Sequence, residues 1–412
     1  MERNSTDKGK NIMKEENERE RSIPDDVSEM ILEKLPLKSV ARFCSVKKRW
    51  AEMITSQHFA QRFLSQSVLK PRILFTSFIS QEIRDGPSYQ WFGSILQVKK
   101  PEVLRQDLLD HPRLLWDSRI SIAQTVLGLV CCHNEKGRSM ICNLSGGGML
   151  MNLPNVDISK REEADFLLGF DQHNKQFKVL CVIWGPSRME ARVLSLLDGN
   201  NSWRKVDCKT PHIPVYRRLY LDGKVYYGAV RPENRKFFFV MCFDLQKEEL
   251  SVIQVPAEAD CDTLVNINNK LGIVRNYFPP DPTQRPRGIW IYESKIWSEL
   301  PYKISLVGLV SEKVHYDCIG TIGTDLLVFA PYHVIGDYLH VVYYDASAGR
   351  HTITRINGVL PTFNYCFEAF LDYVENPTHS SIEGIKKICS PTRHPCDEII
   401  RPGAEDDVVG NP

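Results

Sequence analysis

Residues 22–50 read SIPDDVSEMILEKLPLKSVARFCSVKKRW. Apolar residues after Pro24 recur at the spacing of one helical face: Val27, Met30, Ile31 and Leu35. Pro36 ends this helix, a second short helix follows, and a third is expected to continue past Trp50 to Phe63. Three short helices within about forty residues make a bundle too small to be stable alone, so we expect contact with a partner to stabilise it.

After Pro71 the sequence predicts strands. Short apolar runs rich in Val, Ile, Phe, Tyr and Trp alternate with turn clusters at residues 143–148, 171–174, 198–201, 222–223, 266–269 and 348–349. Asp222 and Gly223 are typical of a tight hairpin. Trp203 and Trp297 are expected to pack over strand ends, and Trp203 is interpreted as a core anchor. The turn spacing favours four-stranded units of about 40–50 residues.

The expected fold is therefore multidomain, with a small all-α three-helix domain followed by a large all-β domain. Residues 1–21 hold six basic and six acidic side chains and almost nothing apolar, which predicts a disordered charged tail. We divide the rest into the helical domain at 22–65, a linker and first strands at 66–115, the β domain at 116–375, and a polar C-terminal tail at 376–412.

Composition excludes several classes of protein. With 52 basic and 51 acidic residues, the net charge of +1 does not provide the broad electrostatic footprint of a nucleic-acid- or membrane-binding protein. No apolar run approaches the roughly 20 residues of a membrane span, and the charged N-terminus is no secretory signal, so a soluble chain that is not exported is expected. Twelve cysteines without a C-x-x-C pair favour a reducing cytoplasm or nucleus.

No catalytic or metal-binding motif is found. The glycines at 146–148 are typical of a hairpin turn, not of a phosphate-binding loop, and Cys389, His394 and Cys396 lack a fourth metal ligand. The acidic cluster of Glu162, Glu163 and Asp165 is interpreted as a solvated loop. The sequence therefore predicts no catalytic residue, no metal and no cofactor.

Two basic and aromatic segments were considered as nucleic-acid contacts. The run at 47–50 falls within the helical domain, where its basic face is most simply solvated. Arg217 and Arg218 beside Tyr216 and Tyr220 are a thin patch by themselves. We therefore expect no nucleic-acid partner.

The stretch at 22–50 resembles an F-box. The family pattern is Leu-Pro-Asp-Asp, an Ile-Leu-x-x-Leu-Pro run and a final Val-x-Lys-x-Trp. This sequence matches it with Ile23 in place of the usual Leu and with Lys47 where Cys or Ser is more common. The resemblance implies docking on a Skp-family adaptor, which binds a cullin scaffold.

The larger domain resembles the F-box-associated interaction domain of plant F-box proteins, a kelch-like, β-rich family. The similarity lies in the segments 128–131, 150–154, 170–180, 202–204, 221–227, 242–245, 288–292, 297–298 and 343–345. The resemblance implies a kelch-like β-propeller or a related β-sheet fold, with an unknown target protein as its ligand.

The apolar surplus of the helical domain marks the candidate contact surface, because a small bundle cannot bury all of it. The candidate adaptor-binding residues are Ile23, Pro24, Ile31, Leu32, Leu35, Pro36, Leu37, Val40, Phe43, Val46 and Trp50. The resemblance then implies a non-catalytic, substrate-recognition adaptor of an SCF-type cullin ubiquitin ligase. Two alternatives stay open: an F-box scaffold outside a ligase, and a β-propeller enzyme or glycan-binding lectin with an appended F-box.

Overall fold

The computed structural model describes residues 23–79, 91–96, 104–105, 107–108, 120–134, 137–145, 148–196, 201–236, 238–256, 263–274, 287–304, 316–322, 326–332, 339–357 and 365–377. The predicted N-terminal tail, the cluster of Cys389, His394 and Cys396, and nearly all of the predicted C-terminal tail lie outside these residues. None of the described helices is long and apolar enough to cross a membrane.

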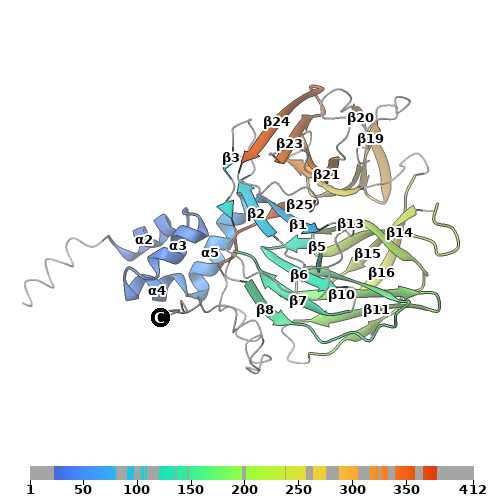
Figure 1. Ribbon diagram of the computed structural model, residues 1–412, viewed down its shortest axis with the longest axis horizontal. Coiled ribbons are helices and arrows are strands. Elements are labelled where there is room, and N and C mark those ends of the chain that lie inside the picture. The colour runs from blue at the N-terminus through green and yellow to red at the C-terminus, as the bar shows by residue number, and fades with distance from the viewer. Residues whose placement is uncertain are drawn as a thin grey trace, which may run out of the picture.

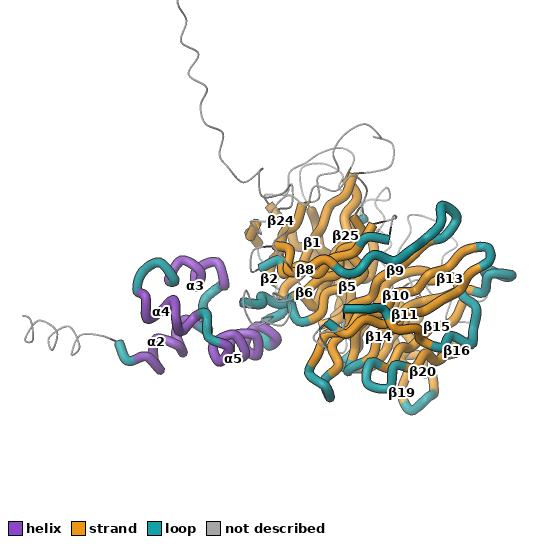
Figure 2. The backbone as a smooth tube through the Cα atoms, turned by 90° about the horizontal axis from the view of Figure 1, so that it is seen from below, coloured by secondary structure: helices purple, strands orange, loops and turns teal. Residues whose placement is uncertain are grey.

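A helical bundle precedes the strands and stands at one side of them (Figures 1 and 2). Its helices are α2 (Asp25–Leu32), α3 (Leu37–Phe43), α4 (Lys48–Ile54) and α5 (Gln57–Val68). The expectation of three helices was wrong by one, since the predicted third helix is divided into α4 and α5. The Ser56 side chain accepts a hydrogen bond from the Phe59 N–H (3.1 Å) and so begins a new helix.

Six antiparallel sheets follow and form the blades of a propeller, as expected for a large all-β domain. Blade I contains β5 (Ile120–Val126), β6 (Leu129–Asn134), β7 (Ser139–Asn143) and β8 (Gly148–Asn152). Blade II contains β9 (Glu163–Asp171), β10 (Gln176–Gly185), β11 (Arg188–Ser195) and β12 (Arg204–Val206). Blade III contains β13 (Ile213–Leu221), β14 (Lys224–Val230), β15 (Phe238–Asp244) and β16 (Glu249–Gln254).

The remaining blades combine local and distant strands. Blade IV contains β17 (Thr263–Ile267), β18 (Lys270–Val274), β19 (Arg287–Glu293) and β20 (Ile296–Ile304). Blade V contains β21 (Tyr316–Ile322), β22 (Leu326–Pro331), β23 (Leu339–Asp345) and β24 (Arg350–Asn357), with β3 (Leu104–Arg105) added in parallel to β24. Blade VI contains β25 (Tyr365–Tyr373), β1 (Arg72–Ile79), β2 (Trp91–Leu96) and β4 (Asp107–Leu108).

Blade VI closes the ring. Its innermost strand, β25, comes from the end of the propeller sequence and pairs antiparallel with β1 from the beginning, with Phe75 opposite Ala369. The six innermost strands (β5, β9, β13, β17, β21 and β25) each contact the next around the circle. Because closure pairs the first strand with the last, both ends of the domain are held in the sheet.

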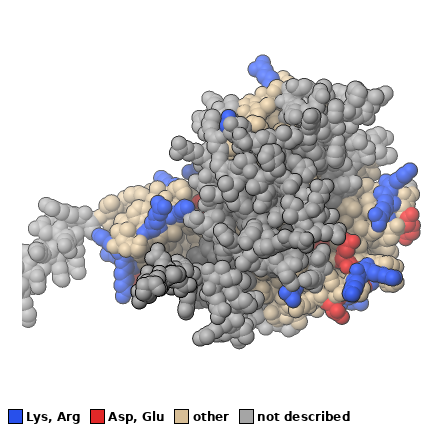
Figure 3. All heavy atoms as spheres, viewed as in Figure 1, with Lys and Arg blue, Asp and Glu red and all other residues tan. Residues whose placement is uncertain are grey.

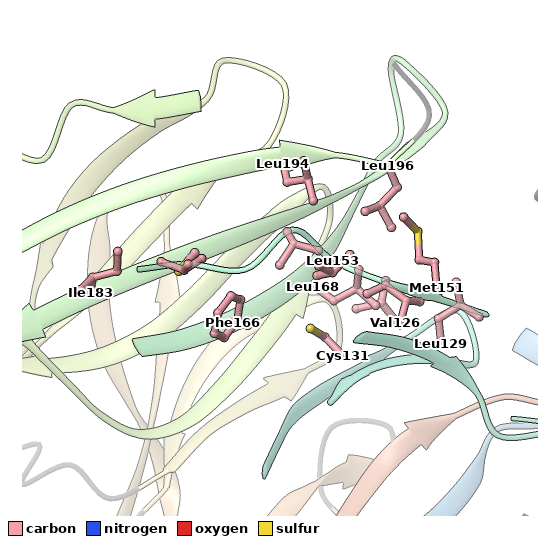
Figure 4. Packing of buried hydrophobic residues seen from close by; sticks show 14 residues of the cluster. Val126, Leu129, Cys131, Met151, Leu153, Phe166, Leu168, Ile183, Leu194 and Leu196 are labelled. Atoms are coloured by element: carbon pink, nitrogen blue, oxygen red, sulfur yellow. The ribbon is translucent and has the colours of Figure 1, made fainter. Parts of the chain in front are cut away.

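The hydrophobic core is divided into layers between neighbouring blades. One layer lies between blades I and II, where Val126, Cys131 and Met151 meet Phe166 and Leu168 (Figure 4). Corresponding layers fill the other five junctions of the ring. Successive side chains of a strand enter different layers: Cys131 faces blade II, whereas Cys132 faces blade VI. This explains the continuous apolar runs in the sequence, since both faces of these strands are buried.

The predicted strand-end anchors are confirmed. The indole Nε1 of Trp203, at the start of β12, donates to the Pro154 carbonyl of the preceding blade (2.8 Å). Trp297 on β20 does the same towards the Gln254 carbonyl (2.7 Å). The turn at Asp222 and Gly223 also has the expected hairpin geometry, with positive φ at both residues and Leu221 paired with Lys224.

Candidate functional site

The helical bundle exposes apolar side chains along α2. Met30 is 50% and Ile31 47% exposed, and Val27 and Ile23 are exposed as well. Positions 27, 30 and 31 share one side of the helix, whereas Ser28 and Leu32 on the other side are buried against the bundle. We call Ile23, Val27, Met30 and Ile31 the α2 face. Large apolar residues grouped on one outward helix face mark a contact surface for another protein.

The structure divides the predicted adaptor-binding residues into three groups. Five are exposed: Ile23, Pro24, Ile31, Pro36 and Val46. Three are partly buried: Leu35, Phe43 and Trp50. The other three are buried in the bundle core: Leu32, Leu37 and Val40.

The burial of Leu32, Leu37 and Val40 corrects the expectation that they belong to the surplus apolar surface. Leu32 is only 3% exposed, and together with Leu37 and Val40 it packs against Ile54, Phe59 and Phe63. A bundle of this size needs an inward residue from every helix to form a core. In this conformation these three side chains cannot contact a partner directly.

Val27 and Met30 were missed as surface residues. Their helical spacing is evident in the sequence, but it leaves open whether they fill the bundle core or face a partner, and they are absent from the predicted adaptor-binding residues. A signal was available: Ile23, Val27, Met30 and Ile31 together are more apolar than a short helix needs for one buried face. Periodicity alone does not tell which side of a helix faces the core.

Exposed basic side chains also lie on the helical bundle. Lys34, Arg42, Lys47 and Lys48 are exposed on the bundle, and Figure 3 shows a group of Lys and Arg side chains there. The acidic side chains of the bundle are largely engaged within it. Glu29 contacts His58 (2.9 Å), Glu33 pairs with Arg62 (2.6 Å), and Asp25 pairs with Arg49. The exposed surface of the bundle therefore carries both apolar and basic side chains.

Glu375 connects the bundle to the propeller. Its Oε2 accepts a hydrogen bond from the backbone N–H of Leu37 at the start of α3 (3.0 Å), and its Oε1 lies 3.8 Å from Arg72 Nη1 on β1. Arg72 is itself buried and donates to Ser94 on β2 (3.0 Å). Asn376 follows, and its side chain donates to the Leu127 carbonyl of blade I (2.6 Å). The segment that closes the ring therefore also positions the helical bundle.

A buried charged cluster joins three blades of the propeller. Asp165 on β9 is 1% exposed and accepts a hydrogen bond from Arg218 Nε on β13 (2.8 Å). Its other oxygen lies 3.4 Å from His133 Nε2 on β6. Two earlier interpretations are thereby corrected: Asp165 is not part of a solvated loop, and Arg218 is not a free basic patch. The strand of blade II turns Asp165 inward, while its neighbour Glu163 stays exposed.

The cluster has the electrostatics of a structural ion pair. Burial lowers the pKa of His133 to about 4, so its ring is neutral at pH 7. Burial opposes ionisation of Asp165, but Arg218, His133 and the backbone N–H of Phe166 together outweigh that effect and hold the pKa of Asp165 below its usual range. Burial also raises the pKa of the nearby Cys131 thiol well above its ordinary value. A protonated thiol is a poor nucleophile, so this arrangement does not form a cysteine-based catalytic site.

A second ionic network joins blades II and III. Lys178 Nζ contacts Asp171 Oδ2 (2.9 Å), Glu248 Oε1 (2.8 Å) and the Leu245 carbonyl (2.7 Å). Arg204 also donates to Glu248 (2.9 Å). The lysine is nearly inaccessible and has acceptors on all sides, so it stabilises the blade junction. Among the described residues, no group of three or more His, Cys, Asp or Glu side chains is arranged to hold a metal ion.

Comparison with protein families gives two matches that together span most of the chain. A family model described as "F-box domain" matches residues 21–62, and one described as "F-box associated beta propeller domain" matches residues 84–374. The chain belongs to the F-box-associated β-propeller family. The combination of the two domains makes it a plant-type F-box protein, and neither matched family model describes an enzyme.

Relatives from Arabidopsis thaliana have the same extent. "F-box protein DOR" is 29% identical over 351 residues, covering 81% of this chain and 87% of the relative. "F-box protein At1g53790" is 29% identical over 374 residues, covering 86% and 81%. Among solved structures, TolB from Acinetobacter baumannii aligns at 9% identity and a TM-score of 0.40 over 72% of this chain and 66% of TolB. An alignment at that level carries no functional information.

Proposed function

We propose that this F-box protein is a non-catalytic adaptor subunit of an SCF-type cullin ubiquitin ligase. In this proposal the bundle binds a Skp-family adaptor, which carries the cullin, and the propeller binds the target protein. The observation that carries the proposal is the α2 face, which leaves four large apolar side chains in water on a helix whose opposite side is already packed. Each square ångström of apolar surface removed from water contributes about 25 cal/mol, which favours a covered state of this face.

The exposed basic side chains of the bundle support the same assignment. An adaptor groove with acidic edges would complement Lys34, Arg42 and Lys47, and such complementarity mainly increases the rate of association. Binding should then weaken as salt rises, because exposed charges are screened over about 10 Å at 0.1 M salt.

The proposed mechanism is proximity. The hydrogen bond from Leu37 to Glu375 ties the F-box to the propeller, so a target held on the propeller keeps a defined position relative to the adaptor. Holding a target lysine near a ubiquitin-charged enzyme raises its effective concentration and needs no chemistry in this chain.

A co-expression experiment tests the proposal. The full chain is produced with a Skp-family adaptor and a cullin and analysed by size-exclusion chromatography. We expect a ternary complex, and we expect the double substitution Met30→Asp and Ile31→Asp to weaken adaptor binding by about 2–4 kcal/mol, since it puts charge on an apolar contact. The fold should be unaffected because both positions are exposed.

Two control variants sharpen the result. Ile296→Asp places the same charge on an apolar residue that is 68% exposed on the propeller, and it should bind the adaptor normally. Leu32→Ala should destabilise the bundle by about 2–5 kcal/mol and should lose binding only through unfolding, which circular dichroism detects. Normal adaptor binding by the double Asp variant would reject the α2 face as the contact. An adaptor complex without cullin would indicate a scaffold outside a ligase.

The proposal also includes a compartment. Twelve cysteines without a C-x-x-C pair suit reducing conditions, and we propose the cytoplasm or nucleus, to be checked by microscopy of the fluorescently tagged chain.

A further inference from the structure

A cavity of about 450 Å³ lies on the propeller axis, at the end that faces the F-box. Its wall includes residues from the innermost strand, or the turn after it, of all six blades, which places it on the axis. The strands β5, β13 and β25 meet in this region in Figure 1. Val68 and Pro71, from the connection between α5 and β1, complete the wall on the side of the F-box. The volume is within the range of about 300–1,000 Å³ that is typical of binding sites.

The rim of this cavity has an exposed apolar side. Val68 is 46% exposed, and its neighbour Leu69 is 74% exposed. Leu127 of blade I and Phe370 of blade VI also line the cavity and are only partly buried. Each square ångström of such surface that is removed from water contributes about 25 cal/mol. An apolar segment that covers the rim would therefore be stabilised there.

Carboxylates flank the mouth of the cavity. Asp222, at the hairpin turn of blade III, and Asp372, on β25 of blade VI, both line the cavity and are exposed. Blades III and VI are opposite each other in the ring of six, so these two charges lie on opposite sides of the axis. Arg218 is the one basic side chain among the described residues of the wall, and it donates to the buried Asp165 (2.8 Å). The mouth therefore favours an occupant that is both apolar and basic.

The C-terminal segment of the chain starts at this mouth. Val374 lines the cavity, and Pro377, three residues later, is the last described residue. Between them, the side chain of Asn376 donates to the carbonyl of Leu127, another residue of the wall (2.6 Å). The chain is therefore fixed at the rim at the point where residues 378–412 follow, outside the described part of the structure.

One stretch of that segment has the composition that the mouth favours. Residues 382–388 read IEGIKKI, with isoleucine at every third position and two adjacent lysines. An extended chain spans at most about 17 Å over the five residues from Pro377 to Ile382, which is enough to reach across the mouth. Residues 397–407 suit the site less well, because they carry five acidic side chains and one basic side chain.

We propose that residues 382–388 bind the central cavity of their own chain, with the isoleucines against the apolar rim and Lys386 and Lys387 beside Asp222 and Asp372. A short tether gives the segment an effective concentration in the millimolar range, so an intrinsic dissociation constant of about 1 mM already fills half of the cavities. Any other ligand of the cavity then has to displace the segment. The site does not involve the adaptor-binding face, so this proposal and the proposed function stand or fall separately.

Disulfide trapping on the full chain tests the proposal. Gln172→Cys places a thiol at an exposed position of the cavity wall, and the native Cys389 directly follows the segment. Under mild oxidation with diamide, we expect the introduced thiol to form a disulfide with Cys389 at least about tenfold faster than in Glu233→Cys. Position 233 is exposed on the turn between β14 and β15, at the opposite end of the propeller. Mass spectrometry of tryptic peptides identifies the bond, and Cys389→Ser should abolish it.

Variants in the segment separate its binding from mere proximity. Ile385→Asp combined with Ile388→Asp should reduce trapping about tenfold, since it puts charge against the apolar rim. Ile399→Asp combined with Ile400→Asp adds the same charge to the acidic stretch and should leave trapping unchanged. Hydrogen exchange gives a readout without an introduced cysteine. The amides of residues 382–388 should exchange more slowly in the native chain than in the first double variant, while circular dichroism shows that the propeller stays folded.

Four results would overturn the proposal. These are equal trapping by Gln172→Cys and Glu233→Cys, undiminished trapping after Ile385→Asp and Ile388→Asp, trapping to Cys396 in preference to Cys389, and equal hydrogen exchange of residues 382–388 in the native chain and the first double variant. A covalent dimer in place of a crosslinked monomer would assign the cavity to the segment of a second copy and so overturn binding within one chain.

Discussion

At the scale of single residues, neighbours in the sequence have opposite environments. Ile31 is in water and Leu32 is in the bundle core. Glu163 is exposed, whereas Asp165 is buried in an ion pair that joins three blades. The two acidic residues look alike in the sequence because both follow Arg161 in a mixed-charge segment. Both side chains lie on the same face of β9, so their difference arises from what covers that face: His133 and Arg218 of the two neighbouring blades cover Asp165, whereas Glu163 is the first residue of the strand and stays exposed.

The Asp165 pair leads to a stability prediction. Asp165→Ala should destabilise the propeller by about 3–5 kcal/mol, because it leaves the Arg218 guanidinium without its buried counter-charge. Glu163→Ala, two residues away and exposed, should change the stability by less than about 0.5 kcal/mol. Urea unfolding followed by circular dichroism measures both. Equal effects of the two substitutions would show that the buried pair does not stabilise the junction.

At the scale of elements, the same tryptophan contact between neighbouring blades recurs in different blades. Trp203 and Trp297 each extend from the outer part of a blade to a backbone carbonyl of the blade before it. The ring packs over the junction while its N–H is satisfied, which is the usual arrangement of a buried indole. The sequence predicts that both rings pack over strand ends, but not that their N–H groups reach the preceding blade. The helices show the opposite case, because the local cap at Ser56 divided a helix that the apolar spacing predicted as continuous.

Replacing the indole by a phenyl ring, which has no N–H donor, tests the hydrogen bond between blades. Trp203→Phe should cost about 0.5–1.5 kcal/mol, the usual contribution of one hydrogen bond, in addition to a small packing loss. Trp297→Phe should cost less, because its hydrogen bond is exposed to water. Trp184→Phe serves as a control, since the Trp184 indole makes no hydrogen bond to the described residues and is partly buried against the core between blades II and III. Thermal unfolding ranks the variants, and a larger loss for Trp184→Phe than for Trp203→Phe would contradict this role.

At the scale of the whole molecule, the ring and the F-box meet at one point. The last strand, β25, closes the propeller against β1, and Glu375 directly after it accepts the hydrogen bond from α3. The same strand carries Asp372 into the central cavity. Closure of the ring, placement of the F-box and formation of the cavity therefore depend on one short segment.

Loss of the Glu375 carboxylate should loosen the F-box from the propeller. Glu375→Ala removes an acceptor of the Leu37 N–H and a neighbour of Arg72, at an expected cost of about 1–3 kcal/mol. Small-angle X-ray scattering should then report a larger maximum dimension than for the native chain, while the propeller stays folded. Glu233→Ala, an exposed substitution on blade III, is the matched control. Unchanged scattering of Glu375→Ala would mean that other contacts determine the orientation.

The sequence by itself determined the local features of this protein. The spacing at residues 22–50 identifies an F-box, the turn at Asp222 and Gly223 predicts a hairpin, and the runs after Pro71 predict a β domain with tryptophan anchors. Each of these rests on residues close together in the chain, where periodicity and turn preference are decided.

Only the tertiary structure decided the features that depend on distant residues. It established six blades, the pairing of β25 with β1, the burial of Leu32 and Asp165, the outward direction of the α2 face, and the central cavity. Periodicity shows that a stripe exists, but the side that is buried depends on what packs against it. Burial is a property of the assembled fold, because the partners of Asp165 come from other blades.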